Sequence, residues 1–287
     1  MKNYLSLVKF SHTIFALPFA LTAFTIAVVE QGKMEWLKLG LVILCMVFAR
    51  NAAMGFNRWL DRDIDAANPR TKVREIPAGV ITPNAALLFV IANCLLFVAT
   101  TWFINPLCFS LSPVALVVVL GYSYTKRFTW LCHVVLGLGL SLAPVGAYLA
   151  VAGQFAWLPV LYGCAVLLWV AGFDVIYALQ DDAFDQSQQL YSIPANFGRK
   201  HALRISEVMH FGTAALMVTA AWKLSVLLPH HAGWLAWLAV AIFLGLLLYQ
   251  HILVKADDLS RVNMAFFTTN GIASLTFGVL TILDLIF

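Results

Sequence analysis

Two groups of acidic side chains are the first sign of chemistry in this chain. Asn57, Asp61 and Asp65 are spaced i, i+4, i+8, which places three oxygen-bearing side chains along one face of a helix. A second group follows 120 residues later, counted from Asp61 to Asp181, and its spacing of i, i+3, i+7, i+11 also describes one helical face. Its members are Asp174, Tyr177, Asp181 and Asp185.

Carboxylates on two opposed helix faces would repel each other, so we expect a cation between the two groups. Oxygen ligands of this kind suit Mg²⁺, which is commonly held by one or two carboxylates together with substrate phosphates. The two acidic groups therefore predict a magnesium site.

Basic residues lie among the acidic residues or follow them closely. They are Arg58, Arg62, Arg70, Lys72, Arg74, Lys126 and Arg127. Arg binds phosphate oxygens in a bidentate manner, and Lys binds them as a point charge. Together with the apolar segments that precede them, these charges suggest a site for a diphosphate head group that carries a lipid tail. The alternative is that they are only the solvated ends of membrane segments, which is the commoner case for an isolated charged residue.

The composition is that of a membrane protein that crosses the bilayer many times. Of the 287 residues, 62% are hydrophobic and 11% are charged, and the mean hydropathy is +0.86. A soluble domain has about 25% charged residues. The formal charge of +4 is small, so we expect no nucleic-acid partner, and no protein partner is inferred. We expect one membrane domain over residues 1–287, with the lipid bilayer as its surroundings.

Nine apolar segments have about the 20 residues that a membrane-spanning helix needs. We expect an all-α bundle of nine transmembrane helices, the first of them a retained span and not a signal peptide. The segments are 10–29, 36–57, 84–103, 106–123, 132–151, 156–178, 206–228, 232–254 and 265–286.

The basic residues predict the orientation of the bundle. Lys33, Lys38 and Lys223 fall near one side and Arg50 lies within a span, which leaves fourteen of the eighteen basic residues on the other side. By the positive-inside rule, the N-terminus and both acidic groups face the cytoplasm. We expect a multi-pass protein of the cell membrane, specifically a bacterial inner membrane.

The two halves of the chain also resemble each other. The acidic groups end the second and the sixth predicted spans, and each is followed by an Ile-Pro-Ala sequence, at Ile76–Ala78 and at Ile193–Ala195. A duplicated four-helix unit followed by one further helix would explain this correspondence.

The patterns Asn-x-x-x-Asp-x-x-x-Asp and Asp-x-x-Tyr-x-x-x-Asp-x-x-x-Asp resemble the two signatures of the UbiA superfamily of intramembrane aromatic prenyltransferases. Four further stretches resemble its 4-hydroxybenzoate polyprenyltransferase-like branch: His12–Pro18, Asn68–Thr71, Arg74–Gly79 and Ser192–Ala195. One departure is Arg58, because many members carry Asp after the Asn. That change removes one possible carboxylate and leaves the other ligands in place.

The resemblance implies transfer of a polyprenyl group from polyprenyl diphosphate to an aromatic acceptor, 4-hydroxybenzoate or a related aromatic acid, in ubiquinone or menaquinone synthesis. It implies a Mg²⁺ site formed by Asn57, Asp61, Asp65, Asp181 and Asp185. The candidates for binding the diphosphate are Arg62, Arg70, Arg74, Lys126 and Arg127. Asp174 or Tyr177 would orient the acceptor hydroxyl or accept the ring proton, and Tyr177 would also stabilise an allylic cation.

Arg50 is a further candidate, because ionisable residues at membrane depth are costly and usually functional. It lies seven residues before Asn57, two turns deeper on nearly the same helix face. If the acceptor is a benzoate, Arg50 is the best available partner for its carboxylate. The alternative is that Arg50 pairs with a backbone carbonyl or with Asp174.

Two other functional classes use similar residues. A transporter also carries intramembrane Asp and Arg, but here the carboxylates gather at one membrane face, and Lys223 and Asp284 do not complete a path across the bilayer. A phosphatidyl-group transferase would use Asp clusters with Mg²⁺, but its Asp-Gly-x-x-Ala-Arg opening is missing from this sequence.

Overall fold

The computed structural model describes Leu7 and residues 15–287. Within this part of the chain, every regular element is a helix. The beginning of the first predicted span and residues 12–14 of the stretch His12–Pro18 lie outside the described residues. The elements are α2 (Leu17–Gln31), α3 (Trp36–Leu60), α4 (Arg62–Ala67), α5 (Pro83–Trp102), α6 (Pro106–Thr125), α7 (Cys132–Ala152), α8 (Trp157–Ala178), α9 (Asp182–Ser187), α10 (Ile193–Leu227), α11 (Trp234–Leu253), the short π-helix η2 (Met264–Thr269) and α12 (Asn270–Ile286).

Seven of the helical segments described are long and apolar enough to cross a membrane, so the count of nine is not reached by this criterion. They are α3, α5, α6, α7, α8, α11 and the continuous segment Met264–Ile286. The described part of the first span is α2, which has only 15 residues. The seventh predicted span is part of α10, whose apolar character is diluted by buried polar residues that pack on α8. Ser206 donates to the Gly172 carbonyl, and a ring nitrogen of His210 lies 3.2 Å from the Trp169 carbonyl oxygen.

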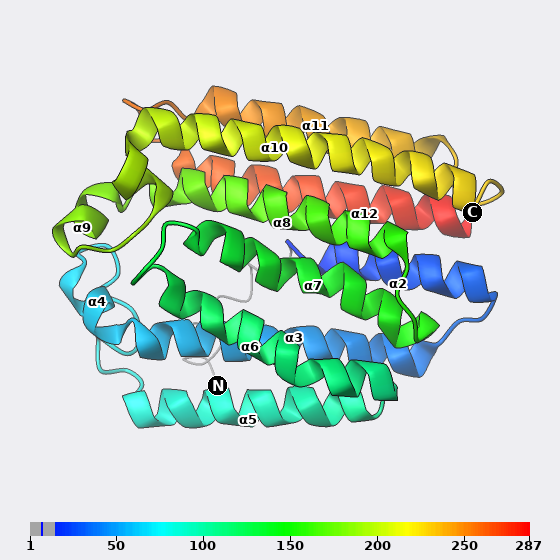
Figure 1. Cartoon of the computed structure of the whole chain (residues 1–287), viewed down its shortest axis with the longest axis horizontal. Coiled ribbons are helices and arrows are strands. Elements are labelled where there is room, and N and C mark those ends of the chain that lie inside the picture. The colour runs from blue at the N-terminus through cyan, green and yellow to red at the C-terminus, as the bar shows by residue number, and fades with distance from the viewer. Residues whose placement is uncertain (1–6, 8–14) are drawn as a thin grey trace.

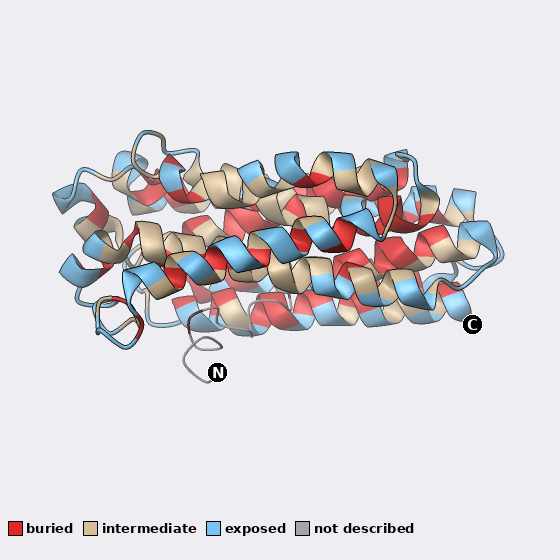
Figure 2. Cartoon of the chain, turned by 90° about the horizontal axis from the view of Figure 1, so that it is seen from below, coloured by how far each residue is buried: buried red, intermediate tan, exposed pale blue. Residues whose placement is uncertain are grey.

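The long helices lie side by side with their axes roughly parallel (Figure 1). The two short helices α4 and α9 lie together at one end of this bundle, and the C-terminus lies at the other end (Figure 1). Aromatic side chains form much of the interior, with Trp169, Phe19, Phe243 and Phe277 all fully buried. Large apolar residues such as Trp157 and Phe211 are exposed on the outside, and exposed positions recur along the outer helices (Figure 2). Such outward apolar surface is expected where the solvent is lipid.

Local sequence signals explain where several helices begin. Thr82 and Asn105 cap α5 and α6, each accepting a bond from a backbone N–H three residues on, and a proline follows each of them at the first helical position. Ser192 caps α10 in the same way. Residues 179–205, which separate the sixth and seventh predicted spans and were expected to form a long loop, are partly helical. Helix α9 forms within them, and α10 begins at Ile193.

Asp284 fastens the last helix to the start of α11. Its carboxylate accepts bonds from the backbone N–H groups of Gly233 (2.6 Å), Ala236 (3.0 Å) and Leu235 (3.3 Å). A carboxylate at a helix N-terminus both satisfies free N–H groups and interacts favourably with the helix dipole. Asp284 therefore has a structural explanation and provides no support for an ion path.

Replacing Asp284 with alanine should lower the free energy of unfolding by about 1–2 kcal/mol, the usual effect of losing a helix cap. The measurement is thermal unfolding of the purified protein in detergent, followed by circular dichroism. Asp257→Ala is the matched control, because Asp257 is exposed in the turn after α11. Equal midpoints for the two variants would contradict the capping role.

Candidate functional site

Each acidic group lies where a long helix gives way to a short one. Helix α3 ends at Leu60, Asp61 has φ −90° and ψ 8°, and α4 then begins at Arg62. Helix α8 ends at Ala178, Asp181 has φ −110° and ψ 3°, and α9 follows. The continuous helical face expected for each group is therefore wrong, because the chain bends between the motif's residues. The bends are alike in the two halves.

The short helices bring the last aspartate of each group into the interior. Asp65 in α4 and Asp185 in α9 are each 5% exposed. In both halves the backbone continues through the bend by the same bond, from Asp65 N–H to the Asp61 carbonyl (2.7 Å) and from Asp185 N–H to the Asp181 carbonyl (2.8 Å). A long helix, an aspartate at the bend and a short helix with a buried aspartate thus occur twice.

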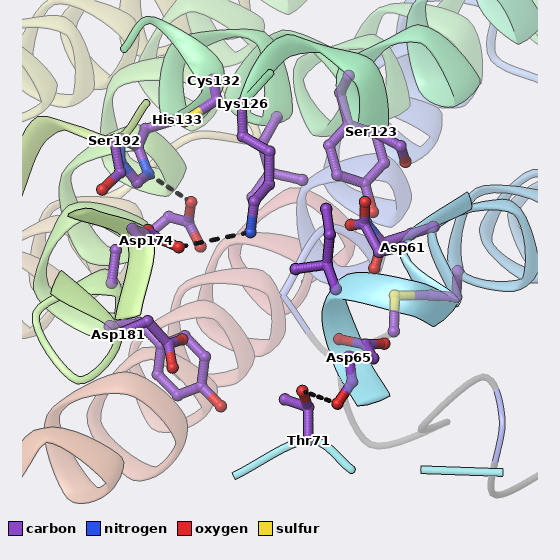
Figure 3. Close-up of a pocket in the computed structure, with 18 of the residues that line it drawn as sticks. Asp61, Asp65, Thr71, Ser123, Lys126, Cys132, His133, Asp174, Asp181 and Ser192 are labelled. Carbon is purple, nitrogen blue, oxygen red and sulfur yellow. Dashed lines mark hydrogen bonds and ion pairs between the residues drawn. The ribbon is translucent and has the colours of Figure 1, made fainter. Parts of the chain in front are cut away.

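The two bends face each other across a polar cavity of about 280 Å³. Figure 3 shows Asp61 and Asp65 on one side, Asp174 and Asp181 on the other, and the Lys126 side chain between them. The cavity brings together all the predicted metal ligands and both candidate catalytic residues. Its charged lining consists of five aspartates, Asp61, Asp65, Asp174, Asp181 and Asp185, and five cations, Arg50, Arg58, Arg70, Arg74 and Lys126.

Four of these aspartates each contact one basic side chain. Arg74 pairs with Asp65 at 2.6 Å, and Lys126 pairs with Asp185 at 3.7 Å. Arg70 makes a two-pronged contact with Asp181, in which Nε donates to Oδ1 at 2.9 Å and Nη2 donates to Oδ2. Arg127 reaches Asp61 at 2.8 Å. Because Arg70 and Lys126 come from the first half of the chain and their partners from the second, these ion pairs join the two halves.

Two of the predicted diphosphate-binding residues do not line the cavity. Arg62, the first residue of α4, bonds back to the end of α3 by donating to the Trp59 carbonyl (2.9 Å), and it pairs with the exposed Asp63. Arg127 pairs with Asp61 and donates to the backbone carbonyls of Ser123 and Leu60. Arg127 therefore ties the end of α3 to α6. A pattern in sequence cannot show on which side of a carboxylate its cation lies.

Burial raises the pKa of both Asp61 and Asp185 above the ordinary value, although Lys126 beside them acts in the opposite direction. A nearby cation favours the charged form of a carboxyl group. Further positive charge beside these two carboxyls would favour their ionised form.

The residues fit a hard divalent cation, although they do not form a finished metal centre. Among the described residues, no three His, Cys, Asp or Glu side chains are arranged to hold a metal ion. However, Asp65 Oδ2 is buried and has no hydrogen-bond partner in the described structure. Asp61 is also a ready ligand, since Asn57 donates to its Oδ2 (2.9 Å) and leaves that carboxylate in a fixed orientation. All of these donors are oxygens, the type that Mg²⁺ prefers.

His133 is a cavity residue that the sequence does not single out, because a lone histidine in an apolar segment is more often a packing residue. The Ile193 N–H donates to its Nε2 (3.3 Å), so the ring carries its proton on Nδ1. That Nδ1–H donates to Asp174 Oδ2 at 2.7 Å, as Figure 3 shows. Asp174 is thus held by a histidine ring, whereas the other cavity aspartates contact Arg or Lys. Only the position of His133 at the start of the fifth predicted span, opposite the sixth, hinted at this contact.

Asn68 is a second residue of this kind. Its side chain donates to Asp181 Oδ1 (3.2 Å), and its own Oδ1 accepts from the Arg70 N–H. Thr71, two residues beyond Pro69, donates to the Asp65 carbonyl. The stretch Asn68–Thr71 thus connects the first bend to the second, and its resemblance to a known family was the only signal for it in the sequence.

Tyr177 forms an aromatic wall of the cavity. Its ring stacks on Phe266, with ring centres 4.2 Å apart and an interplanar angle of 29°. Its hydroxyl accepts a bond from Arg70 Nη1 (3.1 Å). Phe173 and Phe15 also line the cavity. An electron-rich surface of this kind attracts cations.

A second cavity of about 390 Å³ adjoins the polar one and is lined almost entirely by apolar residues of α3, α5, α6 and α7. Along α3 its lining runs from Met54 to Val42, a distance of about 18 Å at the rise of an α-helix. The two cavities share five lining residues, Arg50, Met54, Tyr122, Leu136 and Leu140. Arg50 thus lies at the junction between a charged space and a long apolar one.

The chain is similar to proteins of one family along most of its length. Residues 16–272 match the UbiA prenyltransferase family. A 4-hydroxybenzoate octaprenyltransferase of Tolumonas auensis is 30% identical over 228 residues, which are 79% of this chain and 77% of that protein. Another, of Aliivibrio fischeri (strain MJ11), is 29% identical over 261 residues, or 89% and 87% of the two chains.

Solved structures show the same similarity. The apo structure of a UbiA homologue from Aeropyrum pernix K1 has a TM-score of 0.84 at 31% identity, covering 95% of this chain and 98% of that one. A UbiA homologue from Archaeoglobus fulgidus, bound to DMAPP and Mg²⁺, has a TM-score of 0.77 at 21% identity, with 99% of both chains covered. At that identity the second comparison shows a shared fold.

Proposed function

Since this chain belongs to the UbiA prenyltransferase family, we propose that it transfers a polyprenyl group from polyprenyl diphosphate to an aromatic acid, with Mg²⁺ as cofactor. The observation that carries this proposal is that the charged cavity adjoins the long apolar one and shares five lining residues with it. A polyprenyl diphosphate has a charged head and an apolar tail, and the two cavities match these parts in order. The Mg²⁺ and DMAPP held by the Archaeoglobus fulgidus homologue support the same assignment.

The charged side chains of the cavity suit the head of this donor. We assign metal binding to Asp61, Asp65, Asp181 and Asp185, with Asn57 assisting, and diphosphate binding to Arg70, Arg74 and Lys126. When bound, Mg²⁺ would supply positive charge that stabilises the departing diphosphate. The cavity contains five aspartates and five Arg or Lys side chains, so its formal charge suits a metal–diphosphate complex better than a bare anion.

The reaction breaks the donor's C–O bond, and its electron pair leaves with the diphosphate. Arg70, Arg74 and Lys126 stabilise the charge that develops on the leaving oxygens. Tyr177, stacked on Phe266, shields the allylic cation from water and stabilises it through its ring face. A carbon of the acceptor ring then forms the new C–C bond and loses its proton.

We assign acceptance of the ring proton to Asp174. It lines the cavity, and among the described residues its side-chain partner is the His133 ring in place of an Arg or Lys. Arg50 lies at the junction of the two cavities, and this position suits the carboxylate of the acceptor. The activity of the curated relatives supports 4-hydroxybenzoate or a related aromatic acid, and hence a step of ubiquinone or menaquinone synthesis.

The protein is integral to a membrane, and we propose that this is a bacterial inner membrane with the active site on the cytoplasmic side. The clustering of basic residues at the end that carries both acidic groups supports this orientation. Helices α4 and α9, which carry Asp65 and Asp185, lie at that same end (Figure 1).

The proposal is tested with purified protein in detergent, Mg²⁺, prenyl diphosphates of increasing length and a panel of aromatic acids that includes 4-hydroxybenzoate. Mass spectrometry should detect a product equal to the acceptor plus the prenyl group minus one hydrogen. Chelation of Mg²⁺ should stop its formation. Hydrolysis of the diphosphate without a prenylated product, for every acceptor tried, would refute the proposal.

His133→Ala should lower kcat by roughly 10- to 100-fold, the effect of removing one hydrogen bond to a charged group, while KM for the donor stays unchanged. The reason is that Asp174 loses the ring that holds it in place. His133→Asn should restore much of kcat, because the Asn amide can place an N–H where Nδ1–H lies. Steady-state kinetics of both variants provide the measurement, and an equal loss in His133→Asn would argue against a positioning role.

A further inference from the structure

Arg58 differs in its contacts from Arg70, Arg74 and Lys126, three other cations of the polar cavity. It lies next to Asn57 in α3, it lines the cavity, and it is only 3% exposed. Arg70, Arg74 and Lys126 each contact an aspartate. Within the described structure, by contrast, Nε and Nη1 of Arg58 are buried without any hydrogen-bond partner. A guanidinium has five N–H donors and no way to lose its charge in a protein, so this arrangement is unfavourable until an acceptor arrives.

The charges around Arg58 do not provide that acceptor. Asp65 and Glu75 are near enough to attract it and Arg74 is near enough to repel it. Asp65, however, gives its Oδ1 to Arg74 at 2.6 Å. Its Oδ2 is another buried polar atom of this wall that lacks a hydrogen-bond partner among the described residues. One wall of the cavity therefore carries a buried cation and a buried anionic oxygen that do not bond each other.

We propose that Arg58 binds an oxyanion of a substrate inside the polar cavity, a phosphate oxygen or a carboxylate. This inference rests on the proposed function, because it requires substrates that carry such groups. A ligand with anionic oxygens accepts from the unpaired N–H groups of Arg58, and a cation bound to that ligand satisfies Asp65 Oδ2. Because Arg58 lies beside Asn57 and Asp65, at the metal-binding end of α3, the diphosphate is the source that the geometry favours.

The geometry gives a reason for Arg58, which stands directly after Asn57 where the first signature often has Asp. In the resembling family many members carry Asp directly after the Asn of the first signature, so the local charge there is negative. Here the same position supplies a positive charge that no aspartate neutralises by contact. Arg58 thus remains available to a substrate even while Arg70, Arg74 and Lys126 hold aspartates.

The test measures binding of two probes to ligand-free protein by isothermal titration calorimetry in detergent. The probes are inorganic pyrophosphate with Mg²⁺, which represents the donor head group, and 4-hydroxybenzoate, which represents the acceptor. Arg58→Gln should weaken one of them by roughly 10- to 100-fold, as expected for lost bonds to a charged group, and the probe affected identifies the source of the oxyanion. Arg58→Lys keeps the charge and should lose less. Arg204→Gln, an exposed arginine of α10, is the matched control.

Thermal unfolding of the ligand-free variants distinguishes substrate binding from a structural role. Because Nε and Nη1 of Arg58 have no hydrogen-bond partner in the described structure, Arg58→Gln should leave Tm equal to or above that of the parent protein. Binding of both probes within twofold of the parent would overturn the inference, and so would a loss of binding accompanied by a lower ligand-free Tm. If the parent itself binds neither probe, the proposed function fails, an outcome that is distinct from an effect of Arg58.

Discussion

Replacing Asp61 or Asp185 with alanine is expected to abolish Mg²⁺-dependent prenyl transfer, with kcat falling by roughly 1,000-fold or more, on the scale of losing a main source of electrostatic stabilisation. These residues come from opposite halves of the chain, Asp61 at the first bend and Asp185 in the short helix after the second bend. If one of these carboxylates is missing, Mg²⁺ would bind less well. Less positive charge would then stabilise the departing diphosphate. The measurement is turnover of a prenyl diphosphate with 4-hydroxybenzoate over a range of Mg²⁺ concentrations.

Two further measurements make this expectation specific to metal binding. The residual activity of Asp61→Asn should require more Mg²⁺ for half-maximal rate, because an amide oxygen is a weaker ligand than a carboxylate. Asp63→Ala is the control, since Asp63 lies in α4, two residues after Asp61, with its side chain 85% exposed, and its one ion pair among the described residues is with Arg62. Near-normal rates in both Asp61→Ala and Asp185→Ala would rule out the assigned metal site.

Replacing Arg50 with alanine is expected to raise KM for the aromatic acid by roughly 10- to 100-fold, the range for losing a charge-assisted hydrogen bond, while KM for the donor changes little. Arg50 lines both cavities, which places it where the reactive end of the donor would meet the acceptor. A guanidinium there matches the planar carboxylate of a benzoate. Steady-state kinetics with each substrate varied in turn provide the measurement.

A neutral acceptor provides the control for Arg50. The corresponding phenol without a carboxylate should be prenylated poorly by the parent protein and no worse by Arg50→Ala, because neither substrate nor variant then offers the ion pair. A rise in donor KM with acceptor KM unchanged would instead place Arg50 at the head of the polyprenyl chain. Arg50→Lys should lie between parent and alanine variant, since it keeps the charge but not the planar geometry.

The amino-acid sequence by itself determined the class of the protein and pointed to the charged residues that line the polar cavity. Composition and the length of apolar segments depend only on local sequence, so the helices α3, α5, α6, α7, α8 and α11 lie close to their predicted ranges. The spacing of Asn57, Asp61 and Asp65 likewise survives folding, because three residues within nine positions stay near one another whether the helix bends or not. Family resemblance added Asn68–Thr71, whose contacts no spacing rule would have suggested.

The tertiary structure alone decided how those residues act. Arg70 meets Asp181, 111 positions away, and His133 meets Asp174 across two different helices. No pattern along the chain encodes such pairs, because they depend on how whole helices pack. The bends at Asp61 and Asp181 turned Asp65 and Asp185 inward, whereas Arg62 and Arg127 came to lie outside the cavity. Arg58 is the clearest case, since its sequence position shows only a departure from a signature, whereas its burial without a partner gives it a testable role.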